Sequence, residues 1–348
     1  MKTSYNKYSK REQLPYREGV KSCIGLEPRE KCSMAGDGRH EDNGYLNSLH
    51  TLFVREHNRV ARKLLFWNPY WDDETTFQEA RKVVIAEFQN IVYGEFLPLL
   101  VGQKVARQFD LTPSYNGYFM GYNPHINPST YNEFAVAAAR YGHTLVKYKQ
   151  LRADIDYNTY SNHTVDYYMF NPELPEYGGG IDSLVRASLA DFSYYPTSQV
   201  NDIFTNWLGK DIFYKDSGAK RFSLPALNIQ RGRDHGVQPY VVYRELCGLG
   251  RPYSFDDLEN IPEDVVEQLR KVYKSVEDID LWTGMVSEYP LKDAVVGPTQ
   301  ACKNLKFLIN HFLNFLIFNF VCKVCWPKTL GIGNMVIDGG LRMELTIT

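Results

Sequence analysis

Two long amphipathic stretches constrain the fold of this chain more than any other feature. In residues 47–69, apolar side chains recur with helical spacing, Asn47 or Ser48 can cap the N-terminus, and Pro69 ends the run. Residues 73–102 repeat this spacing over a greater length. Both stretches are predicted helices whose buried faces contain Leu49, Leu52, Phe53, Val60 and Leu64 in the first and Phe77, Ala80, Val84, Phe88, Ile91 and Phe96 in the second.

The rest of the chain keeps this helical character and has no alternation of apolar and polar residues typical of strands. No internal repeat is visible. The run "YGGGID", residues 177–182, lacks the Gly-Lys-Ser/Thr of a phosphate loop, so we interpret it as a turn before a helix. The sequence predicts a mainly helical, single-domain fold, with a loop at 108–128 and further helices in 130–148, 181–192, 234–249 and 262–276.

Charge and apolar content exclude several classes of protein. The 39 basic and 41 acidic residues give a formal net charge of −2, whereas a nucleic-acid binder shows a basic stripe. The strongly apolar run 307–322 is shorter than the roughly 20 residues of a spanning helix, and asparagines interrupt it, so a membrane helix is not expected. The N-terminus has no apolar segment of the kind found in signal peptides. The 25 tyrosines and 19 phenylalanines suit a large aromatic core or pocket.

Six cysteines are too few for a disulfide-dense scaffold of this length. Four of them can form two bridges, Cys23–Cys32 and Cys247–Cys302, which would indicate an oxidising compartment. The remaining pair forms "CKVC", residues 322–325, and a lone CxxC motif is a weak zinc signal.

His143 lies in "AAARYGHTLVKY", residues 137–148, where three alanines favour a helix. Two interpretations of its ring are open. It is either a core histidine with a satisfied hydrogen bond, or one of its ring nitrogens binds a metal. Most helical histidines bind no metal, so this stretch by itself favours the first interpretation.

Six ordered motifs together resemble the animal haem peroxidases, and an ordered set is far more specific than any one motif. The resemblance covers roughly residues 10–302. The motifs are "AGDGRHEDNGYLNSLHTLFVREHNRVA", "FAVAAARYGHTLV", "GGGIDSLVRASLA", "LPALNIQRGRDHG", "DIDLWTGMVSE" and "VGPTQAC".

The resemblance implies a helical haem-peroxidase domain and an enzyme that uses hydrogen peroxide to oxidise small donors, such as halides, thiocyanate or phenols. The implied cofactor is haem b or a covalently linked haem. The implied partners are hydrogen peroxide and a small electron donor, without nucleic acid or membrane. The family also implies an extracellular location.

On the proximal side of the haem, the resemblance assigns His143 as the axial ligand of the iron. A proximal histidine binds iron through Nε2, while an acceptor for Nδ1–H fixes the ring. Asn228 matches that acceptor. Arg140 and Arg231 match positions near the haem propionates, where a guanidinium suits a carboxylate.

On the distal side, Arg39 matches the catalytic arginine, whose charge stabilises the negative charge that develops when peroxide is cleaved. Asp42 falls where relatives carry a glutamate that forms an ester with the haem, but its side chain is one methylene shorter. Asn43 replaces a methionine that some relatives bond to a haem vinyl group. His40 stands beside Arg39 and is not expected to act as the distal base.

The chain departs from the family at both ends. The distal histidine and the calcium loop of the family precede the matched segment, so residues 1–302 are expected to form a partial domain without the distal helix and without calcium. Residues 303–348 do not continue the family pattern. "MVIDGG", residues 335–340, can spell Gly-Asp-Arg-Trp-Trp in another reading frame, close to a family motif, so we interpret the tail as a translated intron or a frameshift.

Three functional hypotheses remain open from the sequence. The first is a haem-dependent peroxidase. The second is a non-catalytic scaffold or fragment of the family, because the distal machinery is not in the matched segment. The third is a fatty-acid dioxygenase, which shares the fold, although the close "RYGHTL" and "LPALNIQRGRDHG" matches favour a peroxidase.

Overall fold

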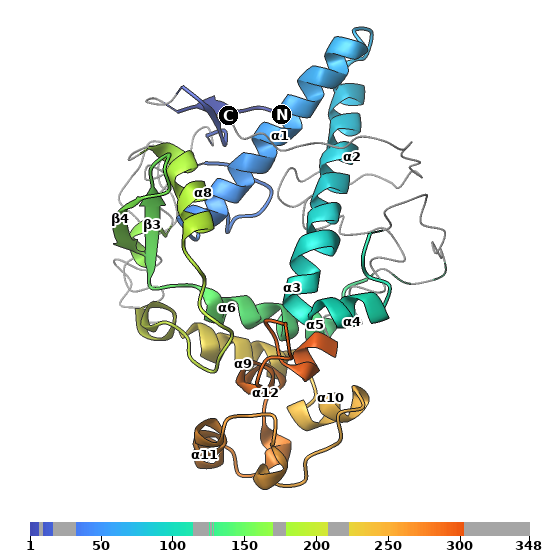
Figure 1. Ribbon diagram of the computed structural model, residues 1–348, viewed down its shortest axis with the longest axis vertical. Coiled ribbons are helices and arrows are strands. Elements are labelled where there is room, and N and C mark those ends of the chain that lie inside the picture. The colour runs from blue at the N-terminus through green and yellow to red at the C-terminus, as the bar shows by residue number, and fades with distance from the viewer. Residues whose placement is uncertain are drawn as a thin grey trace.

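The structure is a computed structural model that describes residues 1–6, 10–16, 33–113, 125, 127, 129–169, 179–207 and 223–302. It is mainly helical, as the sequence predicts. Figure 1 shows a long hairpin of two helices above, short helices across the middle, and a further group below. The first elements are β1 (Ser4–Tyr5), β2 (Glu12–Gln13), α1 (Gly44–Trp67), α2 (Asp73–Ile91), the π-helical turn η1 (Val92–Phe96), α3 (Leu97–Val101) and α4 (Gln103–Gln108).

Helix α1 begins earlier than predicted because Asn43 caps it. The Asn43 side chain accepts a hydrogen bond from Leu46 N at 2.8 Å. Asn47 and Ser48, the predicted caps, are buried inside the helix. The helix ends just before Pro69, as predicted.

The first turns of α1 bury a polar face, which apolar periodicity did not reveal. Leu49 and Leu52, predicted to be buried, are 50% and 43% exposed. Ser48, His50 and Thr51 are buried instead, and each side chain hydrogen-bonds to a carbonyl one turn earlier. These internal bonds satisfy both hydroxyl groups and the Nδ1 atom of His50, which favours burial of this face.

A π-helical turn changes the buried face of the second long helix. Ala80 and Val84 of α2 are buried as predicted. Beyond η1 the face shifts, because a π turn holds more residues than an α turn. Leu97 is therefore fully buried, whereas Phe96, predicted to be buried, is 51% exposed. Ile91, the last residue of α2, was also predicted to be buried and is 38% exposed.

The continuous helical stretch Asp73–Val101 is long and apolar enough to cross a membrane by length and composition, with 33% of its apolar window buried inside the protein. A core helix of a soluble protein passes the same test. Leu97, Leu100 and Val101 belong to the main hydrophobic cluster, which favours a core role for this stretch.

The predicted helix at 130–148 is broken into three pieces. They are α5 (Asn132–Val136), the 3-10 turn η2 (Ala138–Tyr141) and α6 (Gly142–Leu145). The break is at Ala137, whose φ of −133° and ψ of −66° are not helical. The helix propensity of the three alanines is overridden by tertiary contacts.

The prediction of no strands was wrong for two short hairpins. Strand β1 pairs with β2, and β3 (Lys149–Ala153) pairs with β4 (Thr159–Thr164), both antiparallel. In the second hairpin Leu151 is opposite Asn162. Polar side chains on both faces of β4 removed the alternation that identifies a strand.

The remaining helices lie across the middle and bottom of the molecule. Gly179 adopts a left-handed conformation at the start of α8, which agrees with the predicted turn before a helix. The elements are α7 (Val165–Tyr168), α8 (Gly180–Ala190), η4 (Ile203–Trp207), α9 (Leu224–Asp234), α10 (Tyr240–Leu246), η5 (Phe255–Asp257), α11 (Glu263–Val272), η6 (Val276–Asp278) and α12 (Leu281–Ser287).

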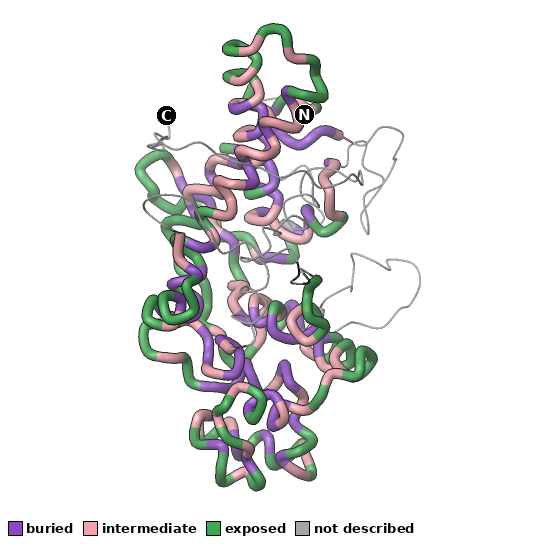
Figure 2. The backbone as a smooth tube through the Cα atoms, turned by 90° about the vertical axis from the view of Figure 1, so that its right-hand side faces the viewer, coloured by how far each residue is buried: buried purple, intermediate pink, exposed green. Residues whose placement is uncertain are grey.

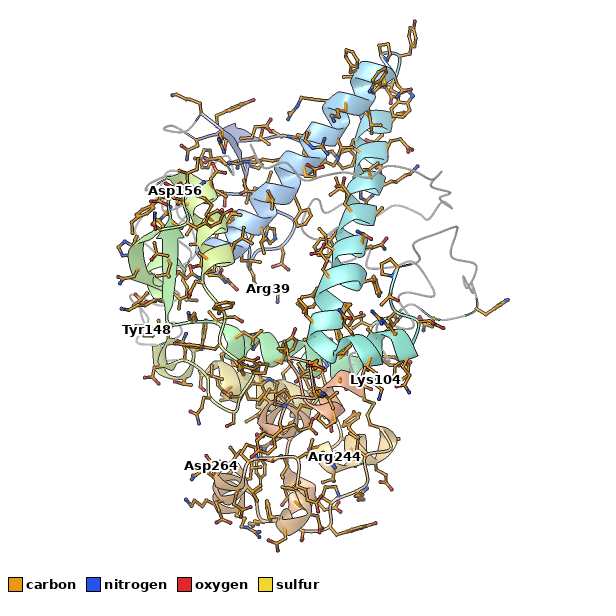
Figure 3. All side chains as sticks on the ribbon, viewed as in Figure 1. Arg39, Lys104, Tyr148, Asp156, Arg244 and Asp264 are labelled. Atoms are coloured by element: carbon orange, nitrogen blue, oxygen red, sulfur yellow. A yellow bond between two sulfur atoms is a disulfide. The ribbon has the colours of Figure 1, made fainter. Side chains whose placement is uncertain are left out.

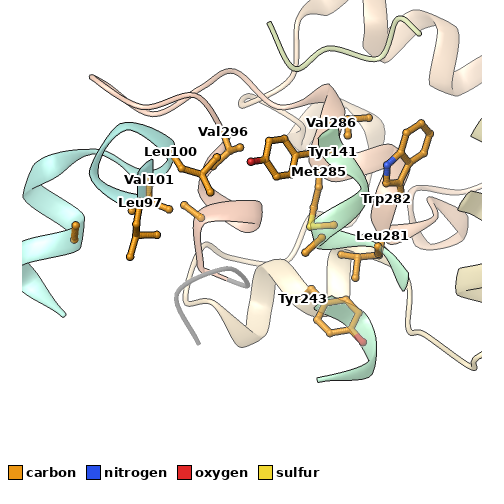
Figure 4. Packing of buried hydrophobic residues seen from close by; sticks show 14 of the residues in the cluster. Leu97, Leu100, Val101, Tyr141, Tyr243, Leu281, Trp282, Met285, Val286 and Val296 are labelled. Atoms are coloured by element: carbon orange, nitrogen blue, oxygen red, sulfur yellow. The ribbon is translucent and has the colours of Figure 1, made fainter. Parts of the chain in front are cut away.

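The main hydrophobic cluster joins the end of the long hairpin to α12. Figure 4 shows Tyr141 among Val296, Met285 and Val286, with Leu100 on the far side of Val296. Figure 2 shows buried backbone concentrated in this middle region and exposed backbone at the tip of the hairpin. The segment that carries His143 is therefore attached to the core.

The predicted bridge Cys247–Cys302 is present, with a Cα–Cα distance of 6.1 Å. It ties the end of α10 to the helical turn at 298–302. The predicted Cys23–Cys32 bridge, the "CKVC" pair and the whole tail 303–348 lie outside the described residues.

Candidate functional site

The side chains of His143 and Asn228 meet, although 85 positions separate them in the sequence. His143 Nδ1 lies 3.0 Å from Asn228 Nδ2. His143 comes from α6, and Asn228 comes from the middle of α9, where it is 1% exposed. The predicted approach of the two residues is present, but the amide nitrogen, and not the predicted oxygen, faces the ring.

Arg140 accounts for this orientation of the amide. Its Nη1 donates to Asn228 Oδ1 at 3.2 Å, and its Nε donates to Ala135 O at 3.3 Å. Because a guanidinium only donates, it selects the oxygen of Asn228 and leaves the NH₂ group for His143. His143 Nδ1 then accepts, and the neutral ring carries its proton on Nε2. Iron ligation through Nε2 requires the opposite tautomer, with the Asn228 amide rotated.

Burial lowers the pKa of His143 to about 4, and the charges of Arg140 and Arg39 act in the same direction against the hydrogen bond from Asn228. A ring with this pKa is neutral at pH 7. The neutral form is the one that binds a metal.

Arg140 and Arg231 form a positive region beside the ring. Burial lowers the pKa of Arg140, and the charges of Arg231 and Arg39 lower it further. Arg231 is exposed on α9. Among the described residues, no carboxylate pairs with either guanidinium. Such a pair of cations without counter-ions suits a ligand that carries two carboxylates.

Arg39 lies between the start of α1 and α6, where Figure 3 shows it. Its guanidinium binds the Asp37 carboxylate through two hydrogen bonds, Nε to Oδ1 at 2.9 Å and Nη2 to Oδ2 at 2.8 Å. The side chain is 76% exposed. The arginine hydrogen bonds hold the pKa of Asp37 well below its ordinary range. Arg39 is thus oriented by Asp37, while most of its side chain stays exposed.

Asp42 is half-buried close to this arginine. Desolvation raises its pKa to about 7, although the charge of Arg39 opposes the shift. Asn43, its neighbour, caps α1 through its side chain. Asp42 therefore carries a proton over much of the range in which an ordinary aspartate is ionised.

His40 and His50 form a buried pair whose ring centroids are 6.0 Å apart. Both nitrogens of His40 are engaged, Nδ1 with Asp37 O at 2.7 Å and Nε2 with Ser33 Oγ at 3.0 Å. His50 Nε2 is buried with no hydrogen-bond partner among the described residues. Sequence reasoning missed His50, because a histidine inside an amphipathic helix carries no signal of its own.

A small hollow lies beside Asn228, on the side of α12. None of the predicted lining residues Arg39, Arg140 and Arg231 lines this hollow. The porphyrin-sized space predicted between them therefore stays a prediction. The lining of the observed hollow is Ala137, Asn228, Ile229, Gly232, Val237, Asp280, Leu281 and Trp282.

The donor set at this site fits a haem. A neutral imidazole is held at one nitrogen by Asn228, and no carboxylate of the described residues neutralises Arg140 or Arg231. A haem supplies a metal for the imidazole and two propionates for the guanidinium groups.

The chain matches the animal haem peroxidase family over residues 1–308 and belongs to it. It is similar to the peroxidasin homologue pxn-2 of Caenorhabditis elegans, with 39% identity over 279 residues, which is 78% of this chain and 20% of that protein. It is also similar to the chorion peroxidase of Drosophila melanogaster, with 38% identity over 84% of this chain and 35% of that protein. The chain thus spans between a fifth and about a third of these relatives.

The fold is similar to that of peroxidase A from Dictyostelium discoideum, with a TM-score of 0.75 and 26% identity over 94% of this chain and 65% of that one. A fatty acid alpha-dioxygenase of Arabidopsis thaliana is similar in fold, with a TM-score of 0.65 and 18% identity over 87% of this chain and 51% of that one. The predicted family and helical fold class are confirmed by these matches.

Proposed function

We propose that this chain carries a haem peroxidase site that uses hydrogen peroxide to oxidise a small donor, such as a halide, thiocyanate or a phenol. The observation that carries the proposal is the part-buried contact between His143 and Asn228, beside two arginines that pair with no carboxylate among the described residues. When bound, haem supplies the redox chemistry of peroxide cleavage.

His143 holds the haem iron through Nε2. The Asn228 amide oxygen accepts a hydrogen bond from His143 Nδ1–H, which fixes the tautomer and the plane of the ring. The proposed cofactor is haem b or a covalently linked haem. Arg140 and Arg231 would bind its two propionates. With a propionate bound to Arg140, the Asn228 amide would be free to turn its Oδ1 toward His143.

Arg39 is the proposed catalytic residue. Its positive charge stabilises negative charge on the departing oxygen of the peroxide, and Asp37 holds the guanidinium in place. Asp42 stands near enough to Arg39 for their charges to interact, and it is proposed to contact the edge of the haem. The electron donor is not specified by these residues.

A non-catalytic haem scaffold is the second candidate. The observation that favours it is that Asp37 already neutralises Arg39, while both nitrogens of His40 are engaged. A fatty-acid dioxygenase is less favoured, because similarity to those enzymes is limited to the fold. We also propose an extracellular location, because the Cys247–Cys302 bridge is typical of an oxidising compartment.

The test is haem reconstitution of the full chain, followed by its Soret band, with His143→Ala as the variant. The wild type should bind haem stoichiometrically, and His143→Ala should not. The exposed histidine substitution His163→Ala is the matched control and should bind haem as the wild type does. Equal binding by wild type and His143→Ala would refute the assignment.

Peroxide turnover separates the two candidate functions. Oxidation of a phenolic donor by the reconstituted wild type, lost in Arg39→Leu, supports the enzyme. Stoichiometric haem binding through His143 without turnover supports the scaffold.

A further inference from the structure

The backbone just before His143 is held by two side chains from distant parts of the chain. Gln300 Nε2 donates to Ala138 O at 3.0 Å, and Trp282 Nε1 donates to Arg140 O at 3.3 Å. These donors are 162 and 142 positions away from their acceptors. Both acceptors belong to η2, the 3-10 turn that leads directly into α6.

The hydrogen bond of Gln300 is its single polar contact among the described residues. The side chain is 1% exposed, and its Oε1 has no hydrogen-bond partner there. Burying half an amide without a partner is unfavourable, whereas an apolar side chain of the same size would avoid that cost. A buried glutamine with one unpaired end is expected where its other end holds a specific group in place, here the carbonyl of Ala138.

Trp282 is buried and donates its hydrogen bond to the same turn. It is 5% exposed and packs in the main hydrophobic cluster, where Figure 4 shows it with Met285 and Val286 near Tyr141. Trp282 also lines the hollow beside Asn228. This residue therefore lies next to both residues of the proposed proximal pair.

The segment that carries Gln300 is itself fixed. The buried Glu288 carboxylate accepts hydrogen bonds from Thr299 N at 2.9 Å and from Thr299 Oγ1 at 2.5 Å. Tyr240 OH donates to the same carboxylate at 2.7 Å. The Cys247–Cys302 bridge closes the segment on its other side. Gln300 thus reaches Ala138 from a rigid base.

We propose that Trp282 and Gln300 are positioning residues for His143. They fix the main chain of η2 and so set the distance and tilt of the imidazole relative to Asn228 and to the iron. The proposal rests on the proposed function for its consequence at the iron, but the hold on η2 is a property of the chain itself.

Amide hydrogen exchange of the full chain without haem tests the hold directly. Trp282→Phe and Gln300→Met keep the bulk of each side chain and remove the donor. Amides of residues 141–145 should exchange about fivefold faster in each variant, the ratio expected for loss of one net hydrogen bond. Gln300→Glu, measured at pH 8, tests the donor a second time, since its carboxylate cannot donate.

Ser287→Ala is the matched control. Ser287 is buried on the same helix as Trp282, and its Oγ donates to Thr283 O at 2.8 Å, away from η2. This variant should leave exchange at 141–145 unchanged. If all three donor variants also leave it unchanged while their melting temperatures fall as in Ser287→Ala, the residues only pack and the proposal is overturned.

A second readout concerns the iron. In the reconstituted ferrous protein, Trp282→Phe and Gln300→Met should shift and broaden the iron–histidine stretching band in the resonance Raman spectrum, and Ser287→Ala should not. If His143→Ala binds haem as the wild type does, the proposed function fails, while the exchange result still decides whether η2 is held.

Discussion

Arg140 and His143, one turn apart, hydrogen-bond to opposite ends of the same amide. Arg140 takes the oxygen of Asn228, and His143 takes the nitrogen. The ligand-binding tautomer of His143 requires the reverse assignment of that amide. The orientation of the Asn228 amide is therefore coupled to whether Arg140 has an anion to bind in place of Asn228 Oδ1.

Replacing Asn228 by aspartate should remove this competition. A carboxylate has two acceptor oxygens, so it can bind Arg140 and accept from His143 Nδ1–H at the same time. A nearby negative charge also favours the imidazolium, so the pKa of His143 should rise from about 4 by about one to two units in Asn228→Asp. The titration of the His143 ring signals by NMR measures the shift.

The pKa of His143 also has a consequence for stability. It is lowered in the folded chain relative to about 6.5 in the unfolded chain, so the unfolded state binds more protons between these values. Stability is then lost as the pH falls from about 6.5 toward 4. Asn228→Asp should reduce this loss, and Asn228→Leu should not. Urea unfolding at pH 7 and pH 4.5 distinguishes the variants.

The titration of Asp42 should change the free energy of unfolding with pH in the opposite direction to that of His143. Its folded pKa of about 7 lies above the unfolded value of 3.8, so the folded state binds more protons between them. Its contribution becomes destabilising as the pH rises through this window. Asp42→Asn should be more stable than the wild type by about 1–3 kcal/mol at pH 8, and by much less at pH 4. Equal differences at the two pH values, or a similar pattern in the exposed control Glu259→Gln, would contradict the assignment.

Two helical glycines should respond in opposite ways to alanine. A Cβ on Gly284 of α12 would approach Tyr240 Cγ to 2.2 Å, so Gly284→Ala should destabilise the chain by about 3 kcal/mol. A Cβ on Gly232 of α9 meets nothing within 4 Å, so Gly232→Ala should stabilise it by about 0.5–1 kcal/mol. Thermal and urea unfolding of the pair measure both effects.

The Cys247–Cys302 bridge should contribute about 2–4 kcal/mol, the usual range for a native disulfide. The double variant Cys247→Ser/Cys302→Ser should lose that amount in urea unfolding under non-reducing conditions. The wild type in excess reductant should match it. A wild type that is indifferent to reductant would show that the bridge adds nothing.

The sequence predicted helices at 181–192 and 262–276, which correspond to α8 and α11, because each shows helical periodicity and has a turn signal or proline close to an end. Of the predicted helix at 234–249, only Tyr240–Leu246 forms α10, since Asp234 ends α9 and Pro239 precedes α10. It failed at 130–148. There the side chains of Trp282 and Gln300 bind carbonyl groups that a continuous helix would use itself. No local pattern can report donors that lie more than 140 positions away.

The candidate site was predicted in part. The approach of His143 and Asn228 followed from matching motifs, and it is present. The orientation of the Asn228 amide was wrong, because it depends on the guanidinium of Arg140. The partner of Arg39, two residues away in "DGR", was also missed, since the loop has no periodicity that fixes where Asp37 points.

Because η2 is held through its main-chain carbonyls, its position does not depend on which side chains it carries. Trp282 binds the main-chain carbonyl of Arg140, so the Arg140 side chain can be replaced without loss of this hydrogen bond. The charge at residue 140 can therefore change, in evolution or by mutagenesis, while the His143 imidazole keeps its position. A chain anchored through side chains alone would lose that freedom, because each change of charge would also move the ligand.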